Sequence, residues 1–156
     1  MKITDIVVEH NAGSFLYSTD RSKLDIPFIH NFLNRSYWAK EIPLETMVES
    51  IENSVCIGIY SDDRQVGFAR VVTDGATFAW LADVFIDEPA RGRGASKFMM
   101  EFIMGFDFVP GLRRFMLATL DAHGLYAQYG FKTPARPDRL MEVLQADIYL
   151  TKNKAG

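Results

Sequence analysis

The chain of 156 residues has the common size of a single domain, long enough for one hydrophobic core and too short for two ordinary domains. With 48% hydrophobic and 24% charged residues, its composition is that of a soluble globular protein and argues against disorder. The 17 Lys and Arg against 20 Asp and Glu give a net charge of −3, which argues against a surface that coats nucleic acid and confines any anion site to a local patch. We therefore expect one domain over residues 1–156.

The beginning of the chain carries no sign of export. MKITDIVVEH has Asp5 and Glu9 where a signal peptide needs an unbroken apolar core. The longest apolar run, residues 76–86, is interrupted by Asp83 and is far shorter than the roughly 20 residues that cross a membrane. The single cysteine, Cys56, has no second cysteine to pair with and lies in an apolar run, which indicates a small core residue. We expect a cytoplasmic protein with no membrane partner.

The first half of the chain predicts two helices and then three strands, all after an N-terminal strand. Apolar residues at helical spacing predict helices over 24–36 and 43–54. Apolar runs predict strands over 55–60, 65–73 and 77–86, because turn-forming residues separate them. These three strands are expected to form an antiparallel meander.

The second half predicts a helical crossover and a closing strand. A strand that is followed by a helix and another strand makes the two strands parallel neighbours. Asp121 is a good N-cap for a short helix, and Gly130 is a good residue to close it. The elements expected in order are a helix over 98–106, a strand over 113–120, a short helix over 121–131, a strand over 141–150 and a frayed tail over 151–156.

The stretch DEPARGRGASKF, residues 87–98, places a glycine-rich loop between a strand and a helix. We call residues 91–96 the glycine loop. Gly92 and Gly94 allow backbone conformations that turn successive N–H groups inward, and the next helix adds its free N-terminal donors and positive dipole end. Arg91 and Arg93 add charge that suits a pyrophosphate better than a single carboxylate. The spacing matches neither the Walker loop nor the dinucleotide loop, so the loop by itself also fits a surface turn with solvated arginines.

Two motifs and their separation resemble the GNAT acetyltransferase superfamily over roughly residues 15–150. LADVFIDEPARGRGAS resembles its fourth strand and its Arg/Gln-x-x-Gly-x-Gly/Ala loop, matched at Arg91, Gly94 and Ser96. Serine stands at the last of these positions where the family usually has Gly or Ala; it is small enough to fit, and its hydroxyl could either donate to a phosphate or crowd the backbone. DAHGLYAQYGF resembles the Leu-Tyr-x-x-x-Gly-Phe helix and turn of the family, matched at Leu125, Tyr126, Gly130 and Phe131.

The resemblance implies an α/β fold in which a mixed, mostly antiparallel twisted sheet has helices on both faces and a splayed parallel strand pair at the cofactor site. It implies acetyl-CoA as the acetyl donor and no metal. It leaves a homodimer open, because homodimers are common among proteins of this kind. The implied cofactor contacts are the backbone of Val84, Phe85 and Ile86 for the pantetheine arm, and Arg91, Gly92, Arg93, Gly94, Ala95 and Ser96 for the pyrophosphate.

Acetyl transfer to an amine needs an uncharged nucleophile, a polarised carbonyl and a proton for the departing thiolate. Tyr126 matches the family's general-acid position, with Tyr129 as the alternative donor and simple core packing as the other interpretation of Tyr126. Asp83 interrupts an apolar strand beside the expected cofactor site, where a carboxylate is costly to bury unless it is paired or useful. It is either the base or amine anchor, or the structural partner of an arginine such as Arg70. Ordered water could replace it as the base.

Tyr37 and Trp38 follow the first helix and are expected to form walls of the acceptor pocket, because their ring faces can attract a cation. The three histidines, His10, His30 and His123, are too dispersed for a metal signature.

The sequence therefore predicts an N-acetyltransferase that moves an acetyl group to a primary amine of a small molecule or peptide by direct attack in a ternary complex. The alternative is a noncatalytic acyl-CoA-binding regulator, which the retained motif tyrosine disfavours. A nucleic-acid-binding module is disfavoured by the net charge and by the lack of an aromatic platform beside the arginines. No motif identifies the acceptor.

Overall fold

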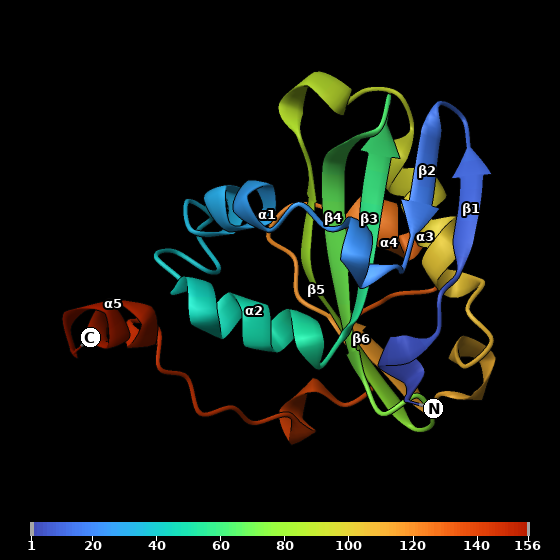
Figure 1. Ribbon diagram of the computed structural model, residues 1–156. Helices are drawn as coiled ribbons and strands as arrows, with labels where there is room; N and C mark the ends of the chain where they lie inside the picture. Colours follow the sequence, from blue (N-terminus) through green and yellow to red (C-terminus); the bar gives the residue numbers. More distant parts are fainter. Residues whose placement is uncertain (1, 156) are drawn as a thin grey trace.

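The computed structural model describes residues 2–155, and its centre is one six-stranded sheet with the strands in chain order (Figure 1). Four of the five strand pairs are antiparallel, and only β5 and β6 run parallel. The strands are β1 (Glu9–Ala12), β2 (Phe15–Ser18), β3 (Val55–Ser61), β4 (Arg64–Thr73), β5 (Phe78–Ile86) and β6 (Arg114–Leu117). This confirms the meander and the parallel pair. Where the sequence predicts an N-terminal strand, the structure has the hairpin of β1 and β2.

The first four helices begin within three residues of the expected positions. The Asp25 side chain caps α1 by accepting a hydrogen bond from the Phe28 N–H. The helices are α1 (Ile26–Leu33), α2 (Leu44–Glu52), α3 (Ala95–Met104), α4 (His123–Ala127) and α5 (Ile148–Ala155), and the 3₁₀ turns are η1 (Ile3–Asp5), η2 (Arg21–Lys23), η3 (Glu88–Ala90), η4 (Val109–Gly111) and η5 (Pro137–Arg139). Among these described helices, none has the length and apolar character needed to cross a membrane.

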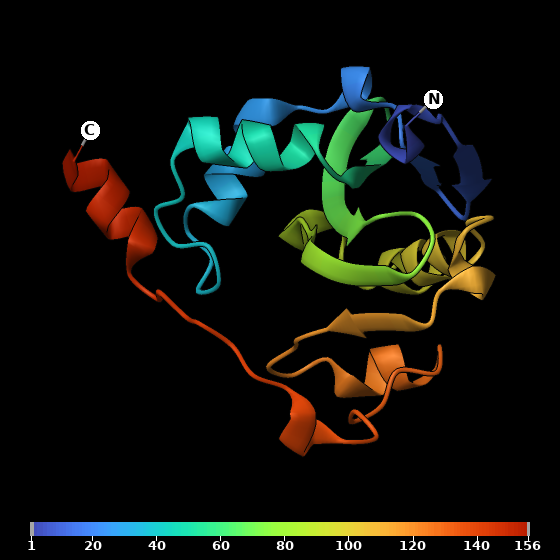
Figure 2. The same cartoon turned by 90° about the horizontal axis from the view of Figure 1, so that it is seen from below.

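Each face of the sheet has its own hydrophobic core, because strand side chains alternate between the faces. On one face, Ile57 and Ile59 of β3 pack in a cluster with α3 and with Tyr126 of α4. On the other, Cys56 and Phe68 pack in a second cluster with α1 and α2. Figure 2 shows α1 and α2 on one side of the strands and α4 on the other. The expected arrangement of helices on both faces is confirmed.

Two expectations about the last third of the chain are wrong. Ala122, not Asp121, is the N-cap residue of α4, and no side chain caps this helix. Residues 140–147, called the C-terminal segment below, form no strand, and α5 follows them through residues for which the sequence predicts a frayed tail. Tyr149 packs against the second core cluster and Asn153 Nδ2 donates to the Glu41 carbonyl over 2.8 Å. The end of the chain therefore docks beside the loop between α1 and α2, which draws the C-terminal segment away from β6.

Candidate functional site

The glycine loop lies between η3 and the first turn of α3, at the end of β5. Gly92 and Gly94 both have φ 81°, a left-handed conformation that disfavours residues with a side chain. Gly94 is also the N-cap of α3. Among residues 2–155, none accepts a hydrogen bond from the backbone N–H groups of Gly92 through Lys97. These donors are therefore available to an anion.

A cavity of about 170 Å³ opens at this loop. Its lining contains most of the residues expected to hold a pyrophosphate, and also Lys97, which the motif does not single out. The sequence could have indicated Lys97 as a cavity residue. It lies two positions after Ala95 and so in the first turn of the helix, where backbone N–H groups have no acceptor within the helix. The lining residues are Ile86, Arg91, Gly92, Gly94, Ala95, Ser96 and Lys97.

The two arginines of the loop have different surroundings. Arg91 Nε donates to the Ile86 carbonyl over 2.9 Å, which holds the side chain along the cavity. The Arg93 guanidinium instead lies 4.8 Å from the centre of the Phe15 ring and its Nη1 donates to Ser14 Oγ over 3.4 Å. Arg91 is thus the better placed of the two to meet an anion in the cavity.

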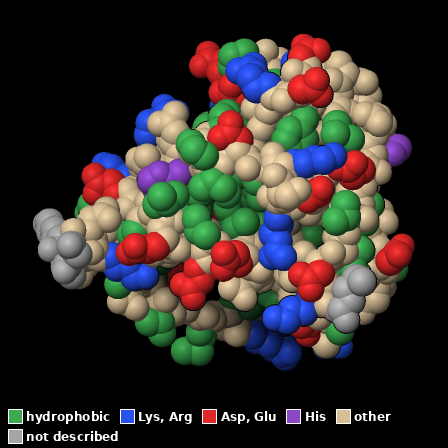
Figure 3. All heavy atoms as spheres, in the orientation of Figure 1, with side chains coloured by type: hydrophobic (Ala, Val, Ile, Leu, Met, Phe, Trp, Pro, Cys, Tyr) green, Lys and Arg blue, Asp and Glu red, His purple; other side chains and the backbone are tan. Residues whose placement is uncertain are grey.

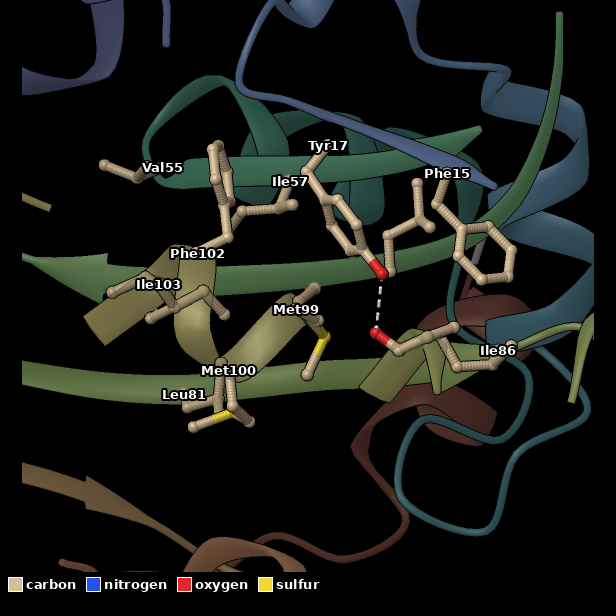
Figure 4. Packing of buried hydrophobic residues seen from close by; sticks show 14 of the residues in the cluster. Phe15, Tyr17, Val55, Ile57, Leu81, Ile86, Met99, Met100, Phe102 and Ile103 are labelled. Atoms are coloured by element: carbon tan, nitrogen blue, oxygen red, sulfur yellow. Dashed lines mark hydrogen bonds between the residues drawn. The ribbon is translucent and has the colours of Figure 1, made fainter. Parts of the chain in front are cut away.

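The start of α3 is held to the sheet by a buried hydrogen bond. Tyr17 of β2 donates from its hydroxyl to the Ala95 carbonyl over 2.8 Å, and the dashed line in Figure 4 marks this contact within the packed side chains of the first core. Tyr17 is fully buried, so its hydroxyl needs this acceptor. The bond fixes the position of the α3 N-terminus relative to β2, and no local pattern in the sequence indicates it.

Beside the loop, the parallel strands part. Only Phe78–Leu81 of β5 pairs with β6, and β5 then continues alone on that side to Ile86. A β-bulge occurs in this stretch, because Asp83 and Val84 together lie opposite Ala69 of β4, and Asp83 has φ 56°. The edge of β5 at Val84, Phe85 and Ile86 is therefore unpaired by β6, as the splayed geometry requires.

Tyr126 lies in the short helix α4 and is 8% exposed. Its ring meets Phe131 edge-on with the centroids 6.1 Å apart. Burial raises the pKa of its hydroxyl above the ordinary tyrosine value, and the nearby Asp121 and Tyr37 raise it further. The hydroxyl is consequently protonated at neutral pH, and within residues 2–155 it has no hydrogen-bond partner. Tyr129 differs, because its hydroxyl donates to the Lys97 carbonyl over 3.2 Å.

Aromatic residues gather on the other side of the parted strands. Trp38 Nε1 donates to Asp83 Oδ1 over 3.0 Å, and its ring meets that of Tyr37 edge-on at 5.1 Å. Phe32 lies 6.4 Å from Trp38 and stacks flat on Phe85 at 3.8 Å. The sequence indicates Tyr37, Trp38 and Asp83 as separate candidates, and the structure brings them together. Phe32 is missed, because its helical spacing marks it only as a core residue.

Both carboxylate oxygens of Asp83 are engaged. Arg70 Nε lies 2.8 Å from Asp83 Oδ2, while Arg70 Nη1 donates to Ser54 Oγ over 3.1 Å. The side chains of Arg70 and Asp83 are 18% and 10% exposed, so the pair is largely shielded from water. The ion pair considered from the sequence is present, and it leaves Asp83 with a bound partner on each oxygen.

Other reactive groups lie outside this site. Burial raises the pKa of the Cys56 thiol to about 12, so it is a protonated core residue as expected. His30 Nε2 lies 2.8 Å from the Ile42 carbonyl. Within the part of the chain that the structure describes, no three His, Cys, Asp or Glu side chains are grouped so that they could hold a metal ion.

Comparisons with known proteins give one consistent result. Residues 24–131 match the model of the Acetyltransferase (GNAT) family, a range that contains the glycine loop, Asp83 and Tyr126. The chain is 29% identical over 137 residues to FG08082 of Gibberella zeae, a protein provisionally classed as an acetyltransferase, with 74% of this chain and 77% of that protein covered.

Two solved structures show the same fold. A Xanthomonas campestris protein that is provisionally classed as a GNAT-family acetyltransferase has 51% identity and a TM-score of 0.84, with 86% of this chain and 96% of that chain covered. A Clostridium acetobutylicum protein solved with acetyl-CoA has 13% identity and a TM-score of 0.62, with 83% and 96% covered. The family match spans more than half of the chain and includes both motifs, so this protein is a member of the GNAT acetyltransferase family.

Proposed function

We propose that this protein is an N-acetyltransferase that moves the acetyl group of acetyl-CoA to a primary amine of a small molecule or peptide. The observation that carries the proposal is the glycine loop, whose backbone N–H groups have no acceptor among residues 2–155 and whose residues line a cavity at the end of β5; the buried Tyr126 supports it. We further propose that residues 1–156 act as one domain in the cytoplasm. The family uses acetyl-CoA, and the loop suits its pyrophosphate because the backbone N–H groups of Gly92 through Lys97 have no acceptor among residues 2–155, and Gly94 has a left-handed φ of 81° that favours glycine.

We assign the pyrophosphate to the N–H groups of the glycine loop, with Arg91 as the principal side-chain contact. Charge-assisted hydrogen bonds from several N–H groups and a guanidinium are strong when they converge on one anion. The pantetheine arm is assigned to the free β5 edge at Val84, Phe85 and Ile86, where it can add hydrogen bonds in the place of a strand. This places the thioester near the bulge at Asp83.

In the proposed reaction, the amine nitrogen attacks the thioester carbonyl, the new C–N bond forms and the C–S bond breaks. The electron pair of that bond remains on sulfur, and Tyr126 gives its hydroxyl proton to the thiolate. The attacking nitrogen loses its proton to water. Tyr126 is suited to the acid role because burial raises its pKa, which keeps the hydroxyl protonated at neutral pH when the thiolate forms.

The acceptor is assigned to the side of the parted strands that carries Tyr37 and Trp38. Tyr37 is 68% exposed, and its hydroxyl is near enough to Tyr126 to influence the pKa of that residue. A cationic or amine-bearing acceptor can lie against these ring faces. Asp83 is held by Trp38 on one oxygen and by Arg70 on the other, so we propose that it positions the Trp38 ring and that ordered water takes the proton.

Two variants separate these roles of Asp83. We expect Asp83→Asn and Trp38→Phe to raise the acceptor KM by a similar factor, roughly 10-fold, because each removes or weakens the same charge-assisted hydrogen bond. Their kcat should change little. If Asp83 were the base, Asp83→Asn alone would lower kcat by about 10²-fold or more. Steady-state kinetics at saturating acetyl-CoA, with each variant's thermal unfolding as the control for folding, distinguishes the two.

The proposed function is tested by CoA release from acetyl-CoA with a panel of polyamines, amino acids, aminoglycosides and peptides. We expect one amine class to be acetylated well above the rate of hydrolysis without amine. Tight acetyl-CoA binding with no acetylated amine in a broad panel would instead support the acyl-CoA-binding regulator. Absence of acetyl-CoA binding would contradict both.

A further inference from the structure

A second cavity, of about 640 Å³, lies between the start of the chain and α3. Residues 3–8, called the N-terminal arm below, form one wall, and α3 with the residues that follow it forms the other. No residue that lines the glycine-loop cavity also lines this one. Figure 3 shows hydrophobic side chains on the surface where Figure 1 has β1 and α3. The volume lies within the range of roughly 300–1,000 Å³ that is typical of sites for small organic molecules.

The walls of this cavity are apolar and largely aromatic. Phe98 and Phe102 lie one turn apart on α3 and both line it. Phe102 meets Phe106 edge-on with the ring centroids 5.1 Å apart, and the Phe106 centroid is 5.7 Å from that of Phe108. The N-terminal arm contributes aliphatic side chains opposite these rings, namely Ile3, Ile6 and Val8. Such walls favour a ligand with an apolar or aromatic body.

The N-terminal arm is held in place by contacts at both of its ends. The Val8 N–H donates to Thr19 Oγ1 over 2.8 Å, and that hydroxyl donates to the Ile6 carbonyl over 3.1 Å. Ile3 packs at the turn between β4 and β5, where a Cβ on Gly75 would lie 3.3 Å from it. Protein cores seldom leave a space of this size unfilled. Because the arm is tied to β2 and to this turn, it does not close onto the aromatic rings.

The charged groups around the cavity favour a cation. Glu101 and Asp107 belong to its lining, are exposed, and form no salt bridge with any residue from 2 to 155. The third carboxylate of the lining, that of Glu9, is already bound, because Lys23 Nζ lies 2.5 Å from its Oε2. None of the residues from 2 to 155 that line the cavity is Lys or Arg, and His10 is the remaining ionisable side chain among them. A positive group at the rim would therefore be attracted by two carboxylates.

We propose that this cavity binds a small organic cation with an apolar or aromatic body, at a site separate from that of acetyl transfer. The apolar body lies among the aromatic rings and the aliphatic side chains of the N-terminal arm. The cationic group lies at the rim, where Glu101 and Asp107 attract it and where aromatic ring faces add to the attraction. The proposal is independent of the proposed function, since the binding site contains neither the glycine loop nor Tyr126.

Calorimetry at low ionic strength with a biphenylbutyl trimethylammonium salt tests the site. A quaternary ammonium has no lone pair that could be acetylated, so its binding is measured apart from the proposed reaction. We expect saturable binding to one site per chain, with methyl NMR shifts at Ile6 and Val8. The alcohol and the carboxylate with the same biphenylbutyl chain should bind more weakly by roughly 10-fold or more, because neither is attracted by the two carboxylates.

A first pair of variants tests the position of the ligand. Val8→Trp puts a large ring into the cavity and should weaken binding of the ammonium salt by roughly 10-fold or more, because the space is then filled. Val7→Trp is the matched control, since the neighbouring side chain is exposed and does not line the cavity. Phe98 is left unchanged, because its ring also packs against Gly94 of the glycine loop. Thermal unfolding of both variants checks that they fold.

A second pair tests the charge preference. Glu101→Gln combined with Asp107→Asn should weaken binding of the ammonium salt by about 10-fold at low salt and leave that of the alcohol unchanged. Glu45→Gln combined with Glu49→Gln removes the same net charge from exposed positions of α2 and should change neither. The comparison separates a local attraction at the rim from the effect of the overall charge.

Four results would overturn the proposal. The first is the absence of saturable binding by the ammonium salt. The second is equally tight binding of the alcohol or the carboxylate. The third is a set of NMR shifts at Tyr37 and Trp38 in place of Ile6 and Val8, which would mean that the salt binds on the side assigned to the acceptor. The fourth is an equal loss of affinity in the two charge variants.

Discussion

Replacing Tyr126 with phenylalanine is expected to lower kcat by roughly 10²–10⁴-fold, the usual contribution of general acid catalysis, with acetyl-CoA affinity unchanged. The substitution keeps the ring, whose edge-on packing against Phe131 and burial in the first core explain its structural role. It removes only the hydroxyl, which has no acceptor among residues 2–155, so folding should be little affected. The measurement is kcat with the preferred amine at saturation and acetyl-CoA binding by calorimetry.

Tyr129→Phe is the matched control for this experiment. It removes a hydroxyl from the same motif, but that hydroxyl is bonded to the Lys97 carbonyl and directed at α3. We expect its kcat to stay within a few-fold of the unmodified protein. Full kcat in Tyr126→Phe, under conditions where the chemical step is shown to limit the rate, would exclude Tyr126 as the proton donor. A large loss in Tyr129→Phe alone would transfer the role to that residue.

The pH dependence of kcat is a second test of Tyr126 as the general acid. Because burial raises the pKa of Tyr126, the donor loses its proton only above the range in which an ordinary tyrosine does. The alkaline limb of the kcat profile should therefore lie above that range, and Tyr126→Phe should abolish this limb along with most of the rate.

The sequence predicts well those parts of the fold whose signal is local. The meander of β3, β4 and β5 follows from apolar runs broken by turn residues, and the glycine loop from two glycines placed before a helix. The C-terminal segment shows the limit of such signals. Its composition favours a strand, but a strand forms only where another strand is close enough to pair with it. The packing of Tyr149 in α5 against the second core cluster determines where the segment lies.

Candidate site residues could be named one by one from the sequence, but their arrangement could not. Trp38 and Asp83 are 45 positions apart, and their hydrogen bond depends on how α1 packs on the sheet. The β-bulge at Asp83, where φ is 56°, could not be predicted from the sequence either. Nothing in the run LADVF indicates that the aspartate adopts a left-handed backbone conformation. The sequence identifies the residue types that could carry the chemistry. Only the tertiary structure shows which side chains form hydrogen bonds with Asp83.

Gly94→Val is expected to weaken acetyl-CoA binding by roughly 100-fold or more, the equivalent of losing two or more hydrogen bonds to a charged group. Gly94 has φ 81°, where a β-branched residue is strained, and a Cβ there would lie 3.3 Å from the Phe98 ring. Relief of this strain rotates the peptide groups around the N-cap of α3 and turns their N–H groups away from the cavity. Calorimetric titration with acetyl-CoA measures the loss.

Gly111→Val is the control for the size of the substitution, since a Cβ at Gly111 meets no atom within 4 Å and the residue lies in η4, away from the loop. Gly94→Val should unfold at a somewhat lower temperature than Gly111→Val because of its backbone strain, and only Gly94→Val should lose affinity. Because the Tyr17 hydrogen bond holds the Ala95 carbonyl from the other side, α3 itself should stay in place and the damage should remain within the loop. Unchanged acetyl-CoA affinity in a folded Gly94→Val protein would mean that the pyrophosphate lies elsewhere, and the assignment of the glycine loop would have to be abandoned.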